Sequence, residues 1–597
     1  MKSPKFSLRE AELRIVINQE RLKFTWKEKL RQQMRGQYLP DPLEFLDIHS
    51  EIDVVARDIA AVVFGGSYTA KPPSRYLIEK SKGLCRQIVL PDVRDALVLQ
   101  CLSDALWHDI KGKAPTTKSF FDIVDNTFKT GADGNGYGPF KSWLQFQKEI
   151  FKFSKDRKYV VITDIANYYD FIRYDHLRNT IAGIVDVRES VLDFLIFVLS
   201  ELLWQPDYMP RIEIGLPQLN FDAPRLMAHC FLYELDEVIT RRHSGDYVRF
   251  MDDIDVGVDT IGEAKNVIKE IDLTLQSRHV RLNSGKTQIL TQKQAAKHFR
   301  VRENHFLNKL EAKLKLADSV FDAKFKIKAP KLFSVALKQG VFDGGNGDKI
   351  LKRVLSYFGS KLVAIPVDVL TEILVRRPSC RGALMKWLSK MPFNLEVIQT
   401  FIGFALSDEV VDDFTIVELS KALVDLNFPR PFPLARKEII EFGLKISPRG
   451  FYGEYSSLWV HAKYGTDDEL FDQIKKITVK AVTSPLMGRL LGGLEPCLCK
   501  SAHSAMYFES LRSVADPSAV QVSNFHTSLR TVPKTFKSVR TIISAPDLSK
   551  PNGLSLGKAL VILSVQKSTS LSATEKSAVM LKHTKFKLDH YLNKLLT

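Results

Sequence analysis

DYVRFMDDIDVGVDT (residues 246–260) and KYVVITD (158–164) are the two stretches that determine the predicted fold. Both are rich in β-branched and aromatic residues and alternate apolar with polar positions, which is typical of strands in a half-buried sheet. The first predicts two short strands joined across Asp252 and Asp253, and the second ends on Asp164. Because the apolar faces of these elements can pair in one sheet, we expect the three carboxylates to meet at one edge.

The segments between and after these strands have helical periodicity. Asp222 is the predicted N-cap of one helix, with Pro224 in its first turn. The order strand, helix, helix, hairpin, helix, strand predicts a compact α+β domain. The elements concerned are helices near Tyr174 to Val185, from Ala223 to Arg242 and from Glu263 to Ser277, followed by the short segment VRLNSGKTQIL (280–290).

Upstream of these elements the sequence predicts a second hairpin. YLIEKSKGLCRQIVL (76–90) turns at Lys82-Gly83, and a helix follows, entered through Pro91-Asp92. GADGNGYGP (131–139) is a predicted loop, and it is not a phosphate-binding Walker loop because Tyr137 stands where lysine is needed. Residues 8–35 place charges and apolar positions at helical spacing, which predicts a basic amphipathic helix or a pair of helices.

Beyond about residue 330 the strand signal fades. Apolar helical stretches such as DKILKRVLSYFGSKLVAI (348–365) follow one another, broken by Pro or Gly every 15 to 20 residues. Such helix pairs can stack as a HEAT-like α-solenoid, although no strict repeat signature is visible. We therefore predict an N-terminal helical extension (1–70), an α+β domain (71–310) and an all-α C-terminal region (311–597).

The composition is that of an ordinary folded protein with a basic surplus. In 597 residues, 86 Lys and Arg stand against 69 Asp and Glu, a net charge of +17. This surplus favours a polyanionic partner, because each neutralised phosphate releases condensed counterions; a basic protein without such a partner is the alternative. The cysteines form no CxxC pair, which argues against a zinc ribbon and favours a reducing compartment. We expect a cytoplasmic protein without a membrane span.

Asp164, Asp252 and Asp253 are the candidate catalytic residues. Phosphoryl transfer from a nucleoside triphosphate requires two divalent cations a few ångströms apart, and hard cations prefer carboxylate oxygens. One acid at a strand end and two in an adjacent hairpin turn supply such ligands. Asp-Asp is also a good turn former, and for an isolated FMDD (250–253) that interpretation would be preferred.

Several motifs in sequence order make the interpretation more specific. DIANYYDFI (164–172), GLPQ (215–218), FMDD and LNSGKT (282–287) resemble the palm motifs of reverse transcriptases. EKSKGLCRQIVLPDVRD (79–95) is similar to the fingers segment of group II intron and retron-like enzymes. The resemblance covers roughly residues 70–300. It implies a right-hand polymerase with fingers and palm, an RNA-directed DNA polymerase that uses dNTPs and two Mg²⁺ or Mn²⁺ ions.

The resemblance also implies roles for three individual aspartates and one lysine. Asp164 and Asp252 match the two metal-ligating aspartates, and Asp253 matches the neighbouring acid that supports them. Lys286 in LNSGKT matches the lysine near the pyrophosphate, a candidate general acid, although a solvated loop lysine would look the same from sequence.

Other matched residues are expected to bind the nucleotide. Tyr169 matches the aromatic gate under the sugar, where a ring collides with a 2′-hydroxyl; the alternative is a core tyrosine beside Tyr168. Gln218 matches the residue that lies against the incoming nucleotide. Arg86 and Lys82 match the fingers residues that clamp the triphosphate.

Two departures from the family pattern stand out. Leu219 follows Gln218 where most relatives have glycine, so we expect its side chain to intrude on the template or nucleotide pocket and make template use unusual. Phe250 replaces the common tyrosine before x-Asp-Asp, which removes one hydroxyl.

The helical C-terminal half resembles the architecture of bacterial defence-associated reverse transcriptases, including the abortive-infection group. That resemblance implies an antiphage role in the bacterial cytoplasm and priming from protein or a partner RNA. It also implies a nucleic-acid partner (an RNA template or noncoding RNA, and a DNA product) and assembly as a homo-oligomer or with a defence protein. Two alternatives stay open: a catalytically inactive nucleic-acid-binding scaffold, and a mobile-element reverse transcriptase.

Overall fold

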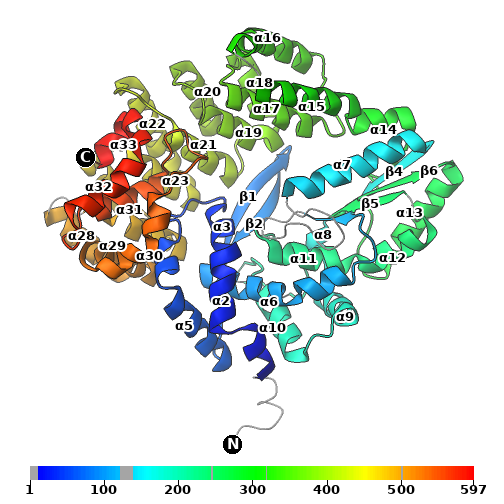
Figure 1. Ribbon diagram of the computed structural model, residues 1–597, viewed down its shortest axis with the longest axis horizontal. Helices are drawn as coiled ribbons and strands as arrows, with labels where there is room; N and C mark the ends of the chain where they lie inside the picture. Colours follow the sequence, from blue (N-terminus) through cyan, green and yellow to red (C-terminus); the bar gives the residue numbers. More distant parts are fainter. Residues whose placement is uncertain are drawn as a thin grey trace, which may run out of the picture. The chain divides into compact units, whose positions relative to one another are not determined.

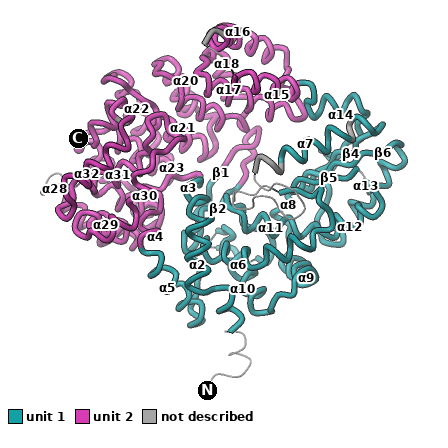
Figure 2. Tube along the Cα trace, in the orientation of Figure 1, with its two compact units in different colours: residues 1–37, 51–76, 87–302 teal, residues 38–50, 77–86, 303–597 magenta. Residues whose placement is uncertain are grey.

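A computed structural model describes the chain as two compact units (Figure 2). The first comprises residues 1–37, 51–76 and 87–302, and the second comprises 38–50, 77–86 and 303–597. The residues described are 11–121, 139–206, 208–210, 212–243, 246–316, 319–498 and 502–596. Almost all of the predicted loop at 131–139 lies outside them.

A five-stranded sheet, in the order β3-β5-β6-β4-β7, organises the first unit. The predicted strand at 158–164 is β4 (Tyr159–Asp164), and the predicted hairpin is β5 (Tyr247–Phe250) with β6 (Asp253–Val258). β4 pairs antiparallel with β6 on one side and with β7 (Gln288–Thr291) on the other, while β3 (Ser119–Phe120) pairs in parallel with β5. The sequence thus predicted the central strands of the sheet.

Helices cover both faces of this sheet (Figure 1). α7 (Pro139–Asp156) and α14 (Gln292–His298) pack on one face, where Phe146, Val160 and Val248 belong to a buried core. α13 (Ile261–Gln276) packs against β4 and β6 with an apolar stripe of buried residues. A capping box between Thr260 and Glu263 starts α13, so the chain turns sharply out of β6 into this helix.

Several predicted helices are confirmed, and one is corrected. α6 (Val93–Gly112) begins at its N-cap Asp92, and α9 (Tyr174–Ile184) and α10 (Glu189–Glu201) pack nearby. The helix predicted from Ala223 to Arg242 is two helices, α11 (Asp222–Phe231) and α12 (Tyr233–Arg242). Leu232 leaves the helical region between them, with φ −95° and ψ 9°.

Asp222 is not the N-cap of α11. Phe221 holds that position, and the Asp222 carboxylate instead accepts a hydrogen bond from Gln33 Nε2 at 3.0 Å. Gln33 lies on α3 (Arg31–Arg35), which continues α2 (Gln19–Thr25) through a short π-helical turn. A partner nearly two hundred residues away in the chain has therefore replaced the local capping bond.

The compact units differ from the three predicted segments. The N-terminal helices, including α5 (Ile52–Phe64), pack with α6 in the first unit instead of forming a separate extension. Residues 38–50, with α4 (Leu46–Ser50), belong to the second unit. There Arg489 binds the carboxylates of half-buried Asp41 and buried Asp47. Long-range ion pairs of this kind have no signature in local sequence.

The second unit is helical beyond the hairpin segment it contains, as predicted for the C-terminal region. Alternate helices pack against each other from α17 through α23, for example α18 on α20 and α19 on α21, as in stacked helix pairs. Among the described helices, none combines the length and apolarity needed to cross a membrane. The helices are α15 (Val301–Leu316), which begins in the first unit, α16 (Ser319–Lys338), α17 (Gly347–Lys361), α18 (Val367–Arg376), α19 (Arg381–Leu388), α20 (Leu395–Leu406), α21 (Asp413–Asp425), α22 (Pro433–Ile446), α23 (Phe451–Tyr464), α24 (Asp467–Lys475), α25 (Val479–Val482), α26 (Pro485–Gly493), α27 (Glu495–Leu498), α28 (Ala502–Val514), α29 (Pro517–Thr531), α30 (Pro533–Ser544), α31 (Leu556–Gln566), α32 (Ala573–Lys582) and α33 (His590–Leu596).

Candidate active site

The sheet brings the three predicted acids together at one edge. Asp164, the last residue of β4, lies directly opposite Asp253, the first residue of β6. Opposed residues on antiparallel strands point to the same face of a sheet, so these two side chains share a face. Asp252 occupies the adjoining turn with Met251, whose φ of 55° is left-handed. The turn is thus Met251-Asp252, one residue earlier than predicted, because Asp253 already pairs with Phe250.

The carboxylates are close enough to perturb one another. Burial raises the pKa of Asp252 to about 7, and the charges of Asp253 and Asp164 and a hydrogen bond with Asp164 act in the same direction. Asp164 is buried, Asp252 is half-buried and Asp253 is exposed. Neighbouring carboxylates in such a setting favour the binding of a positive charge, whether a proton or a metal ion.

Lys286 supplies one positive charge at this edge. Its Nζ lies 2.6 Å from Asp164 Oδ2. Burial lowers the pKa of Lys286, but the hydrogen bond and charge of Asp164 and the charges of Asp253 and Asp252 outweigh that effect and raise it overall. Lys286 is therefore a protonated amine beside the acids, and its role as a general acid stays a prediction.

The LNSGKT segment is hydrogen-bonded to the end of β4. Asn283 N donates to Asp164 O at 2.7 Å, and the hydroxyls of Thr163 and Thr287 lie 2.7 Å apart. Asn283 O in turn accepts hydrogen bonds from the backbone N–H groups of Lys286 and Thr287, which close a tight turn. These hydrogen bonds fix the backbone position of Lys286.

The donor set suits hard divalent cations, which carboxylate oxygens prefer. In the described part of the chain, no group of three or more His, Cys, Asp or Glu side chains is arranged to enclose a metal ion. Ions held by Asp164, Asp252 and Asp253 would therefore complete their coordination with water or a bound triphosphate. Such shared coordination is normal for Mg²⁺, which keeps several of its waters.

Tyr169 and Gln218 lie on neighbouring segments beside β4. Tyr169 is half-buried on α8 (Tyr168–Phe171), and its carbonyl accepts a hydrogen bond from Leu216 N at 2.7 Å. Gln218 Nε2 donates to Asp170 Oδ1 at 3.3 Å. The GLPQ segment thus packs along α8, immediately after the strand that carries Asp164. Nucleotide binding by Tyr169 and Gln218 stays a prediction.

Leu219 is only 6% exposed. Its side chain is enclosed by protein, and its intrusion on a template or nucleotide pocket also stays a prediction. Lys82 and Arg86 are exposed at the β1–β2 hairpin, whose tip (77–86) belongs to the second unit. The expected binding of a triphosphate by Lys82 and Arg86 also stays a prediction.

A buried arginine that the sequence analysis missed holds the Met251-Asp252 turn. Arg249 on β5 has no exposed surface, and its guanidinium donates to Met251 O at 2.9 Å. It also donates to both oxygens of Asp236, which accepts a further hydrogen bond from Tyr247 OH. The available signal was an arginine inside the apolar strand YVRF, a position that requires a buried partner.

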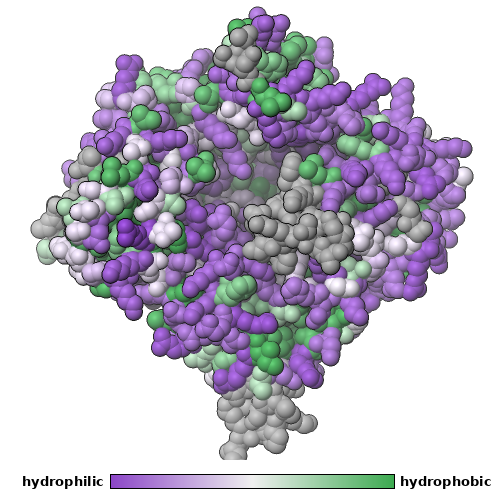
Figure 3. Space-filling model, viewed as in Figure 1, coloured by the Kyte–Doolittle hydropathy of each residue, from purple (hydrophilic) through white to green (hydrophobic). Residues whose placement is uncertain are grey.

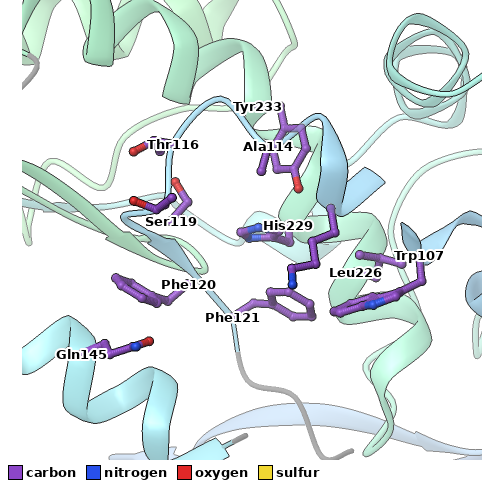
Figure 4. A pocket seen from close by; sticks show the side chains of 12 residues that line it. Trp107, Ala114, Thr116, Ser119, Phe120, Phe121, Gln145, Leu226, His229 and Tyr233 are labelled. Atoms are coloured by element: carbon purple, nitrogen blue, oxygen red, sulfur yellow. The ribbon is translucent and has the colours of Figure 1, made fainter. Parts of the chain in front are cut away.

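An aromatic pocket lies beside this hairpin (Figure 4). Its lining includes Trp107, Phe121, His229 and Tyr233. The rings of Phe121 and His229 stack with centroids 4.5 Å apart. Burial, with the charge of Arg249, holds the pKa of His229 well below its ordinary value, so the imidazole is neutral. His229 O accepts a hydrogen bond from Arg249 at 3.3 Å, which connects the pocket wall to the arginine that binds the Met251-Asp252 turn.

Comparisons with known proteins give only weak likenesses. No protein-family model matches this chain, and no curated protein matches its sequence. Solved structures that match include apo telomerase from Candida tropicalis, at 12% identity and a TM-score of 0.28, over 78% of this chain and 74% of that chain. Telomerase from Candida albicans in complex with a TWJ fragment of telomeric RNA matches at 11% identity and a TM-score of 0.29, over 66% of each chain. At these values the function must be argued from the geometry of the acidic edge.

Proposed function

We propose that this protein is a nucleotidyltransferase that synthesises DNA from dNTPs, an RNA-directed DNA polymerase with a right-hand fingers and palm domain. The register of Asp164 opposite Asp253, with Asp252 in the adjoining turn, is the observation that carries the proposal. It places carboxylates from two strands at one sheet edge, in the order and motif context that the sequence resemblance implies. Lys286 beside Asp164 supplies the cationic group expected at the same edge.

In this mechanism the acids bind and orient, and the lysine moves a proton. Asp164, Asp252 and Asp253 would hold two Mg²⁺ or Mn²⁺ ions. When bound, the ions lower the pKa of the attacking 3′-hydroxyl and neutralise the leaving pyrophosphate. Lys286, protonated beside Asp164, donates a proton to the pyrophosphate oxygen as a general acid. Tyr169 excludes a 2′-hydroxyl by its ring, Gln218 lies against the incoming nucleotide, and Arg86 and Lys82 bind the triphosphate.

A basic helix in the second unit supports a nucleic-acid partner. α16 carries Lys324, Lys326, Lys328 and Lys331, all exposed, and its surface mixes hydrophilic with hydrophobic side chains (Figure 3). Exposed apolar residues lie among these lysines, including Ile327 at 69% exposure. Closely spaced lysines attract a phosphate backbone, and binding of this kind weakens as salt rises.

More specifically, we propose that this polymerase is an antiphage enzyme of the bacterial cytoplasm with unusual template use and priming. The helical region that follows the α+β domain and the leucine at position 219 support it. RNA template or noncoding RNA, DNA product, and a homo-oligomer or a partner defence protein are the associations proposed with it. Sequencing the nucleic acid that copurifies with the protein would identify template and product together.

Incorporation of labelled dNTPs with Mg²⁺ or Mn²⁺, with and without added RNA, tests the proposal. The double variant Asp252→Ala/Asp253→Ala should lose incorporation by more than about 100-fold while keeping its fold. Asp259→Asn is the matched control, because it alters an acid at the far end of β6 that pairs with Arg157 instead of the site. Full activity in the double variant would refute the assignment, and an inactive wild type that still binds RNA would favour the scaffold alternative.

A further inference from the structure

The hairpin that carries Lys82 and Arg86 turns tightly at its tip. β1 (Ser74–Ser81) and β2 (Leu84–Leu90) are joined by Lys82-Gly83, both left-handed, with φ of 52° and 78°. Such two-residue turns match the natural twist of a two-stranded ribbon. Glu79 Oε1 accepts a hydrogen bond from Gly83 N at 2.9 Å, so the Glu79 side chain reaches back and closes the turn.

A buried arginine of the helical region holds this glutamate. Arg381 Nη1 lies 2.7 Å from Glu79 Oε2 and 3.5 Å from Asp412 Oδ1. Its Nε donates to Leu374 O at 2.8 Å, and its guanidinium carbon lies 4.9 Å from the centre of the Phe404 ring. Arg381 is 2% exposed and Glu79 is 7% exposed, which makes the pair a desolvated one. Removing one partner of such a pair leaves an uncompensated buried charge.

Two aspartates at the start of α21 bind the outer edge of the hairpin. Asp412 Oδ2 accepts from Glu79 N at 3.2 Å, and Asp413 Oδ2 accepts from Leu77 N at 2.9 Å. Alternate N–H groups on an edge strand point outward and need partners when they are covered. Asp412 is the N-cap residue of α21, yet its side chain makes no capping bond to that helix. Its carboxylate accepts the hydrogen bond from the hairpin instead.

A two-stranded ribbon is marginally stable by itself. At its tip this ribbon depends on Arg381, Asp412 and Asp413, and in the first unit Val89 N donates to Gln218 O at 3.0 Å. A buried arginine bound to Glu79 and two aspartates that accept hydrogen bonds from backbone N–H groups define one register for the ribbon. They therefore also fix the positions from which the exposed Lys82 and Arg86 side chains project.

We propose that Arg381, with Asp412 and Asp413, is the positioning cluster for the triphosphate-binding hairpin, so that the helical region sets the affinity for the incoming dNTP. This inference rests on the proposed polymerase function. The cluster acts through Lys82 and Arg86, and it touches neither nucleotide nor metal. Any change in the helical region that shifts Arg381 changes nucleotide binding without altering the acids.

Steady-state kinetics on the full chain test the positioning role. In Arg381→Lys the charge stays but the fork of donors is lost. We expect the KM for dNTP to rise roughly tenfold while kcat stays within about twofold, because loose positioning weakens binding of the triphosphate. Arg530→Lys is the matched control, since Arg530 makes a bidentate pair with Glu495, and not with Glu79, in the same helical unit.

Amide hydrogen exchange provides a readout that does not depend on activity. In Asp413→Ala the Leu77 amide should exchange roughly 10- to 100-fold faster, because it loses its acceptor, while core amides of β4 stay protected. An active wild type in which Arg381→Lys and Arg530→Lys have the same KM would overturn this inference and leave the proposed function intact. A wild type that incorporates no dNTP would overturn both.

Discussion

Arg249 and Asp236 form an ion pair with no exposed surface, in which Nε and Nη2 meet the two carboxylate oxygens at 2.7 and 2.5 Å. The third arm of the guanidinium binds Met251 O, at the turn that carries Asp252. The pair therefore links α12 to the hairpin tip. It fixes the turn by a hydrogen bond to the backbone and not to the acidic side chains.

Replacing Arg249 separates the stabilising effect of this pair from its positioning effect. Arg249→Met should lower the free energy of unfolding by about 3–5 kcal/mol, since Asp236 keeps a buried charge without its partner. Arg249→Met/Asp236→Leu should recover part of that stability but not the rate of incorporation, because Met251 O still lacks its donor. Urea unfolding and kcat, measured on both variants, check this. A double variant with the wild-type rate would contradict the positioning role.

Removing one acid should stabilise the metal-free protein. Burial and the charges of Asp253 and Asp164 act against ionised Asp252, so Asp252→Asn should raise the free energy of unfolding by about 1–3 kcal/mol at pH 8 without metal. If the proposed metal site exists, Mg²⁺ should raise the Tm of the wild type, and the same variant should lose that rise. Thermal melts with EDTA and with Mg²⁺ provide the measurement. Asp259→Asn is the control, and equal Mg²⁺ stabilisation of the Asp252→Asn variant would contradict a metal site here.

Local patterns in the sequence were enough to predict the sheet edge. Alternation in 158–164 and 246–260 predicted β4, β5 and β6, and strand-end acids predicted that Asp164 would meet the hairpin. The turn was placed one residue late because a left-handed Met251 is uncommon for a side chain of that kind. Its conformation is explained by Arg249, whose bond to Met251 O depends on tertiary packing.

Contacts between distant parts of the chain were beyond local patterns. Aspartate is a residue type favoured at helix N-caps, but the Asp222 carboxylate binds Gln33 instead of capping α11. Glu79 lies in a hairpin segment that contains several charged residues, and its partner Arg381 lies about three hundred residues later in the chain. Periodicity and capping rules describe neighbours along the chain, so they cannot identify which of many charged residues will form a buried pair.

Asp95 should make stability depend on pH. It is 3% exposed, and burial, with the charge of Asp92, raises its pKa to about 6. A folded-state pKa above the unfolded value means that the folded protein keeps this proton longer, so this contribution to stability is lost as pH rises from about 4 to 6. Asp95→Asn keeps a neutral group beside Tyr68 OH, which lies 2.7 Å from Asp95 Oδ1.

The stability of Asp95→Asn relative to wild type should therefore increase by up to about 3 kcal/mol between pH 4 and pH 6, and stay level above that. Denaturant unfolding across this pH range measures the difference. Asp53→Asn is a control of opposite sign, because a hydrogen bond from Lys23 lowers the pKa of the exposed Asp53 carboxyl. A relative stability of Asp95→Asn that does not change with pH would contradict the buried, protonated carboxyl.

If the proposed polymerase function holds, Leu219 should decide how a template is used. Its side chain is enclosed by protein, so Leu219→Gly should cost about 2–5 kcal/mol of stability through the cavity it leaves. If the leucine keeps the backbone away from a base pair, Leu219→Gly should copy added heteropolymer RNA more fully than the wild type does. Leu219→Met, which conserves volume, should leave the products unchanged. Sequencing the products of the three proteins, with and without RNA, distinguishes these outcomes. Efficient copying of arbitrary RNA by the wild type would show that the leucine imposes no restriction, since the bulkier residue would then already tolerate any template.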